Sequence, residues 1–220
     1  MSNQNPAIQN EEKELPFHMN YIPLFVQRKC ELELKETPDR RTQSIQELRN
    51  FLKDDEATKD IWFHEDFLVQ YLRHSKYNTH KAFTYLRKYY ILRNNDANLF
   101  ESLPDEIFLT LKSTKFASVL PKRCPDGCTV LLIQLGKWDP DELPFDYFKR
   151  IAVITFSQLF RDPMTQINGI KVIYDFDGTR MEQLKYGTPR NLYLFYYMAF
   201  VEMYSWPVQR SPHFKSKYFV

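Results

Sequence analysis

The chain has 220 residues, of which 43% are hydrophobic and 26% charged, and its formal net charge at pH 7 is only +2. This much apolar material excludes an intrinsically disordered chain, and the length predicts one large domain or two modest ones. The five glycines are too scattered for a Gly-x-Gly-x-x-Gly or phosphate-loop motif, which excludes the two common glycine-rich nucleotide sites.

Cysteine usage and apolar run length predict the compartment. Three cysteines, Cys30, Cys124 and Cys128, form no disulfide framework for a chain of this size, and the odd number is typical of a reducing compartment. The N-terminal residues lack the basic and then apolar regions of a secretory signal. The longest apolar run, residues 192–201, is about half of the roughly 20 residues that a membrane-spanning helix needs. We therefore predict a soluble, cytoplasmic protein.

The first part of the chain has helical patterning after a loose tail at residues 1–23. Apolar residues recur at helical spacing from Leu24, around Ile45, and from Asp66 and Asn78 onward. Pro38 ends the first of these helices, and Asn78 is suited to cap the fourth. The pattern predicts an all-helical N-terminal domain over residues 24–95.

The second part changes character near Lys115. Strand-like runs at residues 116–120 and 129–135 flank a turn that carries Pro and Gly, and a third run follows at residues 169–174. Helical patterns occupy residues 144–160 and the segment that begins at Pro189. Strand, helix, strand and helix in this order predict an α/β domain over residues 96–220, with a parallel pair in a mixed sheet.

Two short motifs could mark a catalytic or metal site. The run from Asp175 to Thr179 resembles the Asp-x-Asp-x-Thr motif of haloacid-dehalogenase-type phosphatases, but no Asp and only two Glu follow Gly178. Cys124 and Cys128 lack the further Cys or His ligands of a structural zinc site. No Gly-x-Ser-x-Gly nucleophile elbow occurs. The sequence predicts neither an enzyme nor a cofactor, and the Asp175 run is interpreted as a turn.

Residues 67–95 combine cations and aromatic rings with no acidic residue. One interpretation is a face that binds an anionic membrane, whose membrane-facing cations are Arg73, Lys76, Arg87 and Lys88. The other is structural, with the aromatic rings in the core and the cations on an ordinary solvated face. No RNA-stacking signature occurs, so no nucleic-acid partner is expected. The apolar helix at residues 192–201 is open to two interpretations too: a core helix buried on every side, or one wall of a cavity for an apolar ligand.

The order of these features resembles the CRAL-TRIO family. The N-terminal match lies in residues 31–38, 45–49 and 66–73. The second part matches at two longer motifs, Gly-Lys-Trp-Asp-Pro at Gly136–Pro140 and Thr-Gln-Ile-Asn-Gly-Ile at Thr165–Ile170. It also matches at Asp175, Thr188–Pro189 and Tyr204–Pro207. Each motif alone is weak, but the two together at this separation are specific.

The resemblance implies a helical bundle followed by an α/β domain with a mixed sheet and a deep hydrophobic pocket. It implies a non-enzymatic, monomeric carrier of a small hydrophobic ligand, of tocopherol, retinoid or phospholipid type, moving between membranes. Peripheral contact with endosomal or other anionic, phosphoinositide-containing membranes is implied as well. The implied ligand-binding residues are Phe116, Ile133, Val153, Phe156, Ile170, Tyr174, Met181, Met198, Val201, Trp206 and Val208.

The sequence departs from the family pattern after Pro207. The last strand and the lid helix of the family find no counterpart in residues 208–220, so the resemblance implies an incomplete lipid-binding domain, truncated at its C-terminal end. The alternative function is therefore an interaction module, or an inactive truncated isoform, that holds no ligand and docks through its basic helical face.

Overall fold

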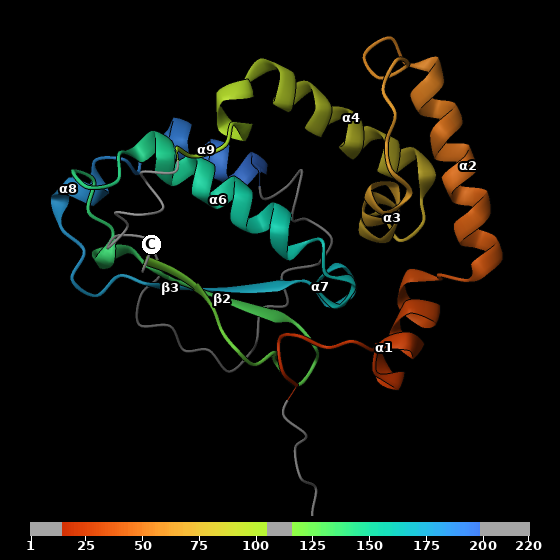
Figure 1. Cartoon of the computed structure of the whole chain (residues 1–220), viewed down its shortest axis with the longest axis horizontal. Helices are drawn as coiled ribbons and strands as arrows, with labels where there is room; N and C mark the ends of the chain where they lie inside the picture. The colour runs from red at the N-terminus through yellow and green to blue at the C-terminus, as the bar shows by residue number, and fades with distance from the viewer. Residues whose placement is uncertain (1–14, 105–115, 199–220) are drawn as a thin grey trace, which may run out of the picture.

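The structure is a computed structural model, and it describes residues 15–104 and 116–198, with side chains described up to residue 193 (Figure 1). Within these residues, no helix combines the length and the apolar character that crossing a bilayer requires.

The N-terminal part is helical, as predicted. It contains α1 (Leu24–Lys29), a π-helical turn (Cys30–Leu34), α2 (Pro38–Asp54), α3 (Glu65–His74), α4 (Thr79–Asn95) and a 3-10 helix (Ala97–Phe100). Thr37 caps α2 by accepting a hydrogen bond from the Arg40 amide at 3.2 Å, directly before Pro38. Asn78 caps α4 by accepting from the Lys81 amide at 2.9 Å, which confirms the predicted boundary.

One apolar core holds α2, α3 and α4 together. Leu48, Leu68, Leu72, Ala82 and Leu86 are each fully buried in it. The aromatic rings of residues 67–95 lie in this core or pack against it: Phe67, Tyr71, Tyr77, Phe83, Tyr85, Tyr89 and Tyr90. The aromatic rings of this segment recur at helical spacing because they form an ordinary helical core.

The C-terminal part is built on a three-stranded mixed sheet. Its strands are β1 (Ala117–Val119), β2 (Thr129–Gln134) and β3 (Ile170–Asp175), in the order β1-β2-β3. β1 pairs antiparallel with β2, and β2 pairs parallel with β3, so the predicted parallel pair is confirmed. In register, Ile133 of β2 lies beside Ala117 on one side and Tyr174 on the other.

Helices complete this part of the chain. After β2 come a 3-10 turn (Leu135–Lys137), α6 (Phe145–Leu159) and α7 (Pro163–Asn168), and after β3 come α8 (Met181–Leu184) and α9 (Pro189–Met198). Figure 1 shows α6 running over one face of the sheet, with α7 at the end of the sheet nearest α1 and α3. The sequence did not predict α7, although Asp162 caps it and Pro163 occupies its first turn.

The segment after β3 is a turn, as interpreted from the sequence. The Asp177 amide donates to the Asp175 carboxylate at 3.0 Å, and Gly178 has a φ of +70°. Gly136 lies so close to the Asp177 carbonyl that a side chain there has no space. The Asp175 carboxylate also accepts a hydrogen bond from Gln134 at 3.1 Å, so it ties the ends of β2 and β3 together.

Candidate functional site

An apolar stripe of α6 faces the sheet. Phe148 marks this stripe, because its ring stacks on Phe116 with the ring centroids 4.6 Å apart. Ala152, Thr155 and Phe156 follow at four, seven and eight residues, so they share the face with Phe148. All three are only half-buried. This stripe of α6 is therefore only partly covered by the described residues.

The opposing face of the sheet carries three of the predicted ligand-binding residues. Ile133 and Tyr174 are register partners, and Ile170 lies on the same face of β3 as Tyr174 because side chains alternate along a strand. Ile133 and Ile170 are half-buried, whereas Tyr174 is 61% exposed. We name Ile133, Ile170 and Tyr174 of the sheet, together with Phe156 of α6, the apolar wall.

Two predicted ligand-binding residues, Phe116 and Val153, are buried in packed protein. Phe116 is buried in a cluster with Trp138, Leu143 and Phe148, and Ile133 packs against the same cluster. Val153 points away from this cluster: it is buried against Leu92 and Leu99 of the helical part. The structure therefore does not bring Val153 together with the apolar wall, because α6 presents that residue on its other side.

The remaining predicted ligand-binding residues are exposed or outside the described part. The Met181 side chain in α8 is 76% exposed. Met198 ends α9, but its side chain is not among those described, and Val201, Trp206 and Val208 lie outside the described residues. The interpretation that residues 192–201 are buried on every side is wrong at the start of this helix, where Leu192 and Tyr193 are exposed.

Two surface hollows lie elsewhere. One of about 540 Å³ runs along α2 and is lined mainly by polar side chains such as Gln46 and Arg49. The other, of about 450 Å³, lies beside residues 16–21 and Asp162. Neither hollow includes a residue of the apolar wall. Within the described residues, no group of three or more His, Cys, Asp or Glu is arranged to hold a metal ion.

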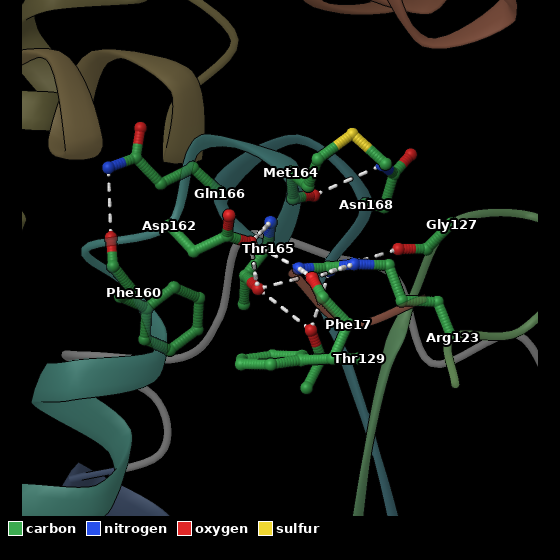
Figure 2. Close-up of polar contacts among 10 residues, drawn as sticks. All are labelled: Phe17, Arg123, Gly127, Thr129, Phe160, Asp162, Met164, Thr165, Gln166 and Asn168. Carbon is green, nitrogen blue, oxygen red and sulfur yellow. Dashed lines mark hydrogen bonds and ion pairs between the residues drawn. The ribbon is translucent and has the colours of Figure 1, made fainter. Parts of the chain in front are cut away.

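Within residues 15–104 and 116–198, a dense group of polar contacts surrounds α7 (Figure 2). The side chain of Arg123 is fully buried there and pairs with Asp162 at 2.6 Å. It also donates to the Thr129 hydroxyl at 2.8 Å and to the Phe17 carbonyl at 2.8 Å. Arg123 thus joins the start of β2, the cap of α7 and the N-terminal segment. Arg123 was not predicted from the sequence, since nothing local distinguishes it from a surface arginine.

A second buried arginine reaches α7 from the helical part. Arg73 donates to Gln166 at 2.6 Å and pairs with Glu36 at 2.8 Å. Gln166 in turn donates to the carbonyl of Phe160 at the end of α6, at 2.9 Å. Burial disfavours the charge of Arg73, but the hydrogen bonds and charge of Glu36 outweigh it and raise the pKa of Arg73. The prediction that Arg73 faces a membrane is wrong, because its guanidinium is buried and paired.

The other predicted membrane-facing cations are less buried than Arg73. Lys76 and Lys88 are exposed, whereas Arg87 pairs with Asp55 at 2.6 Å. Burial alone would raise the pKa of Asp55, but the hydrogen bond and charge of Arg87 outweigh it and lower that pKa. Of the four cations predicted to face a membrane, the structure leaves Lys76 and Lys88 on the open surface.

Asn168 is the third contact of α7 with its surroundings. Its side-chain oxygen accepts a hydrogen bond from Lys29 of α1 at 3.1 Å, and its side-chain nitrogen donates to the Met164 carbonyl at 3.0 Å. Its backbone carbonyl accepts from the Cys128 thiol at 2.9 Å. The Thr-Gln-Ile-Asn segment therefore acts as a junction between the helical part and the sheet.

The model of the CRAL/TRIO domain matches residues 113–204, which include the sheet, α6, and α7 with its junction segment. The chain belongs to the CRAL/TRIO domain family. This family consists of lipid-binding proteins, and its match covers both sides of the apolar wall. Within this CRAL/TRIO domain, Gln166 and Asn168 are buried and make the contacts of the junction.

Curated relatives extend the similarity into the helical part. The human protein named alpha-tocopherol transfer protein-like is 27% identical over 161 residues, which cover 73% of this chain and 47% of that protein. Clavesin-1 of Xenopus laevis is 30% identical over 171 residues, covering 76% of this chain and 51% of that protein. Mouse clavesin-2 is 27% identical over the same length. The chain spans about half the length of these relatives.

Proposed function

We propose that the chain binds one small hydrophobic ligand and carries it between membranes. The observation that supports this most is the apolar wall, where Ile133, Ile170 and Phe156 are half-buried and Tyr174 is largely exposed. Apolar side chains that are not fully covered favour an apolar occupant, since burial of their surface against it is stabilising. The name of the human relative points to tocopherol as the first ligand to test, with retinoids and phospholipids beside it.

In this proposal the side chains bind the ligand by shape and by exclusion of water. No covalent bond is made or broken. α6 is anchored at both ends: near its start by the stacking of Phe148 on Phe116, and just after its end by the hydrogen bond from Gln166 of α7 to Phe160. The spacing between the wall residues is therefore set before a ligand arrives, which lowers the entropic cost of binding.

We further propose that the carrier works in the cytosol and meets anionic, phosphoinositide-containing membranes through exposed cations of the helical part. Lys88 is on the open surface of α4, and Lys81 lies seven residues before it on the same face. The charge of such residues favours an anionic surface by about 1 kcal/mol each. Sedimentation with vesicles that contain or lack phosphatidylserine and phosphoinositide tests this step, with Lys81→Glu/Lys88→Glu expected to reduce binding only to the anionic vesicles.

A pair of matched tyrosine variants tests the ligand site. Tyr174→Asp places a charge on the apolar wall, whereas Tyr21→Asp makes the same change at a residue of similar exposure, 64%, in the N-terminal segment. We expect Tyr174→Asp to weaken binding of nitrobenzoxadiazole-labelled α-tocopherol, or of retinol, by about tenfold or more, because a carboxylate beside an apolar ligand loses its hydration. Tyr21→Asp should bind as the unaltered chain does. Equal affinities for the two variants would contradict the proposed site.

A further inference from the structure

We propose that Cys124 and Cys128 form a reversible disulfide across the turn before β2, and that its formation releases Cys128 from Asn168 of the junction. This modification site is independent of the proposed function, since it follows from the turn and its contacts alone. Both cysteines are reduced in the structure, with Cys124 half-buried and Cys128 buried.

The turn brings the two cysteines opposite one another. The Gly127 amide donates to the Cys124 carbonyl at 2.8 Å, and the Cys124 amide donates to the Cys128 carbonyl at 3.0 Å. Gly127 has a φ of +85°, in the left-handed region. A three-residue loop with a left-handed last residue and these two bonds is the hairpin connection with a glycine bulge, in which the residues before and after the loop close the hairpin as a pair.

One backbone hydrogen bond joins the two cysteines directly, from the Cys124 amide to the Cys128 carbonyl. Cα atoms of directly opposed antiparallel residues lie about 4.5–5.5 Å apart, within the roughly 4.4–6.8 Å that a disulfide spans. Side chains of directly opposed residues also lie on the same face of the hairpin.

The thiol of Cys128 has a structural partner that oxidation removes. It donates to the Asn168 carbonyl at 2.9 Å, and the Asn168 side chain lies directly against Gly127, where an added side chain would collide with it. A disulfide sulfur carries no proton to donate. The Asn168 carbonyl, buried at the end of α7, would then lose this donor, while Lys29 would keep its contact with the Asn168 side chain.

The chemistry needs a two-electron oxidant, for which we name hydrogen peroxide. Cys124 reacts first because it is the more accessible thiol: its sulfur attacks one peroxide oxygen, the O–O bond breaks, and Cys124 sulfenic acid and one water form. The sulfur of Cys128 then attacks the Cys124 sulfur, the S–O bond breaks, and the departing hydroxide takes the Cys128 proton as a second water. Two thiols and one peroxide thus give one disulfide and two waters.

The pKa of Cys128 agrees with its reacting second. Burial, and then the charge of Asp126, raises this pKa to about 12, so the thiol is protonated at neutral pH and reacts slowly with peroxide. Cys30 serves as an internal control, because burial, and then Glu36, raises its pKa to about 11 and it lies in a different segment of the chain.

Peptide mapping tests the link directly. The full chain is reduced, treated with one equivalent of hydrogen peroxide, alkylated and digested with trypsin under non-reducing conditions. Trypsin cuts after Arg123 and Lys137, so both cysteines fall in residues 124–137, while Cys30 falls in residues 30–35. We expect the 124–137 peptide to escape alkylation and to weigh two hydrogen atoms less than its reduced form. We expect the Cys30 peptide to be alkylated, and dithiothreitol to reverse the change.

Variants and hydrogen exchange complete the test. Cys30→Ser should leave the oxidised peptide unchanged, whereas Cys124→Ser and Cys128→Ser should abolish it. In the oxidised protein, amides of residues 164–169 should exchange about tenfold faster, as expected for a junction that has lost a buried hydrogen bond. Cys128→Ser keeps a donor for Asn168 and should exchange as the reduced protein does. Alkylated Cys128 beside an oxidised Cys124, or equal yields of the link in urea-unfolded and folded protein, would overturn the proposal.

Discussion

The guanidinium of Arg73 makes a two-pronged ion pair with Glu36, with both nitrogen–oxygen distances at 2.8 Å. Its remaining nitrogen donates to Gln166, and both side chains of the ion pair are largely buried. α3, the connection between the π-helical turn and α2, and α7 therefore meet at one charge. A buried pair of this kind adds little net stability against an apolar replacement, but removal of one partner leaves an uncompensated charge.

Arg73→Gln should consequently lower the free energy of unfolding by about 3 kcal/mol. The matched control is Arg87→Gln, which removes a cation whose side chain is 42% exposed and should cost about 1 kcal/mol or less. Urea unfolding followed by circular dichroism measures both. Similar losses for the two variants would show that Arg73 does not hold the junction together.

Gly127→Ala probes the contact between the turn and Asn168. An alanine there must adopt a left-handed conformation, and its methyl group would lie 2.6 Å from the Asn168 amide nitrogen. Gly178 offers a control with a similar φ, +70°, and open space around it. We expect about 1 kcal/mol of destabilisation for Gly178→Ala and about 1–3 kcal/mol more for Gly127→Ala. Thermal unfolding of both variants tests this, and equal effects would contradict a tight contact with Asn168.

Acid should lower the free energy of unfolding through His74, which lies in the helical part. Burial lowers the pKa of His74 to about 4 from an ordinary value of 6.5, so the unfolded chain binds more protons than the folded one between these two values. The contribution of neutral His74 to the free energy of unfolding is fully present above pH 6.5 and is lost as the pH falls toward 4. The loss amounts to about 2 kcal/mol between pH 7 and pH 4.5. His74→Phe should remove this part of the slope, because phenylalanine does not titrate. A variant with the same pH dependence as the unaltered chain would contradict the assignment.

Local patterns predicted most of the fold. Ile45, Leu48 and Leu52 repeat at helical spacing and all lie in the core of the helical part, while Asn78 and Thr37 begin their helices through contacts within three residues. The strands and their parallel pairing followed from apolar runs and element order. These features depend on residues close in sequence, so they can be predicted from the sequence alone.

The junction could not be predicted in this way. Arg73 and Gln166 lie 93 residues apart, and a cation between aromatic residues is equally typical of a membrane-facing helix. α7 has only six residues, too few for a helical repeat of apolar positions to be recognised. Val153 illustrates the same limit, because α6 is apolar on several sides and only its neighbours Leu92 and Leu99 decide which side a residue faces.

Native mass spectrometry tests the central claim, that the apolar wall holds one small hydrophobic ligand. The chain is incubated with vesicles of a total lipid extract to which α-tocopherol and retinol have been added, separated from the vesicles, and measured intact. We expect a species heavier than the protein by the mass of one hydrophobic molecule, and we expect Tyr174→Asp, but not Tyr21→Asp, to lose it. A folded protein that leaves the vesicles without any bound molecule would contradict the account.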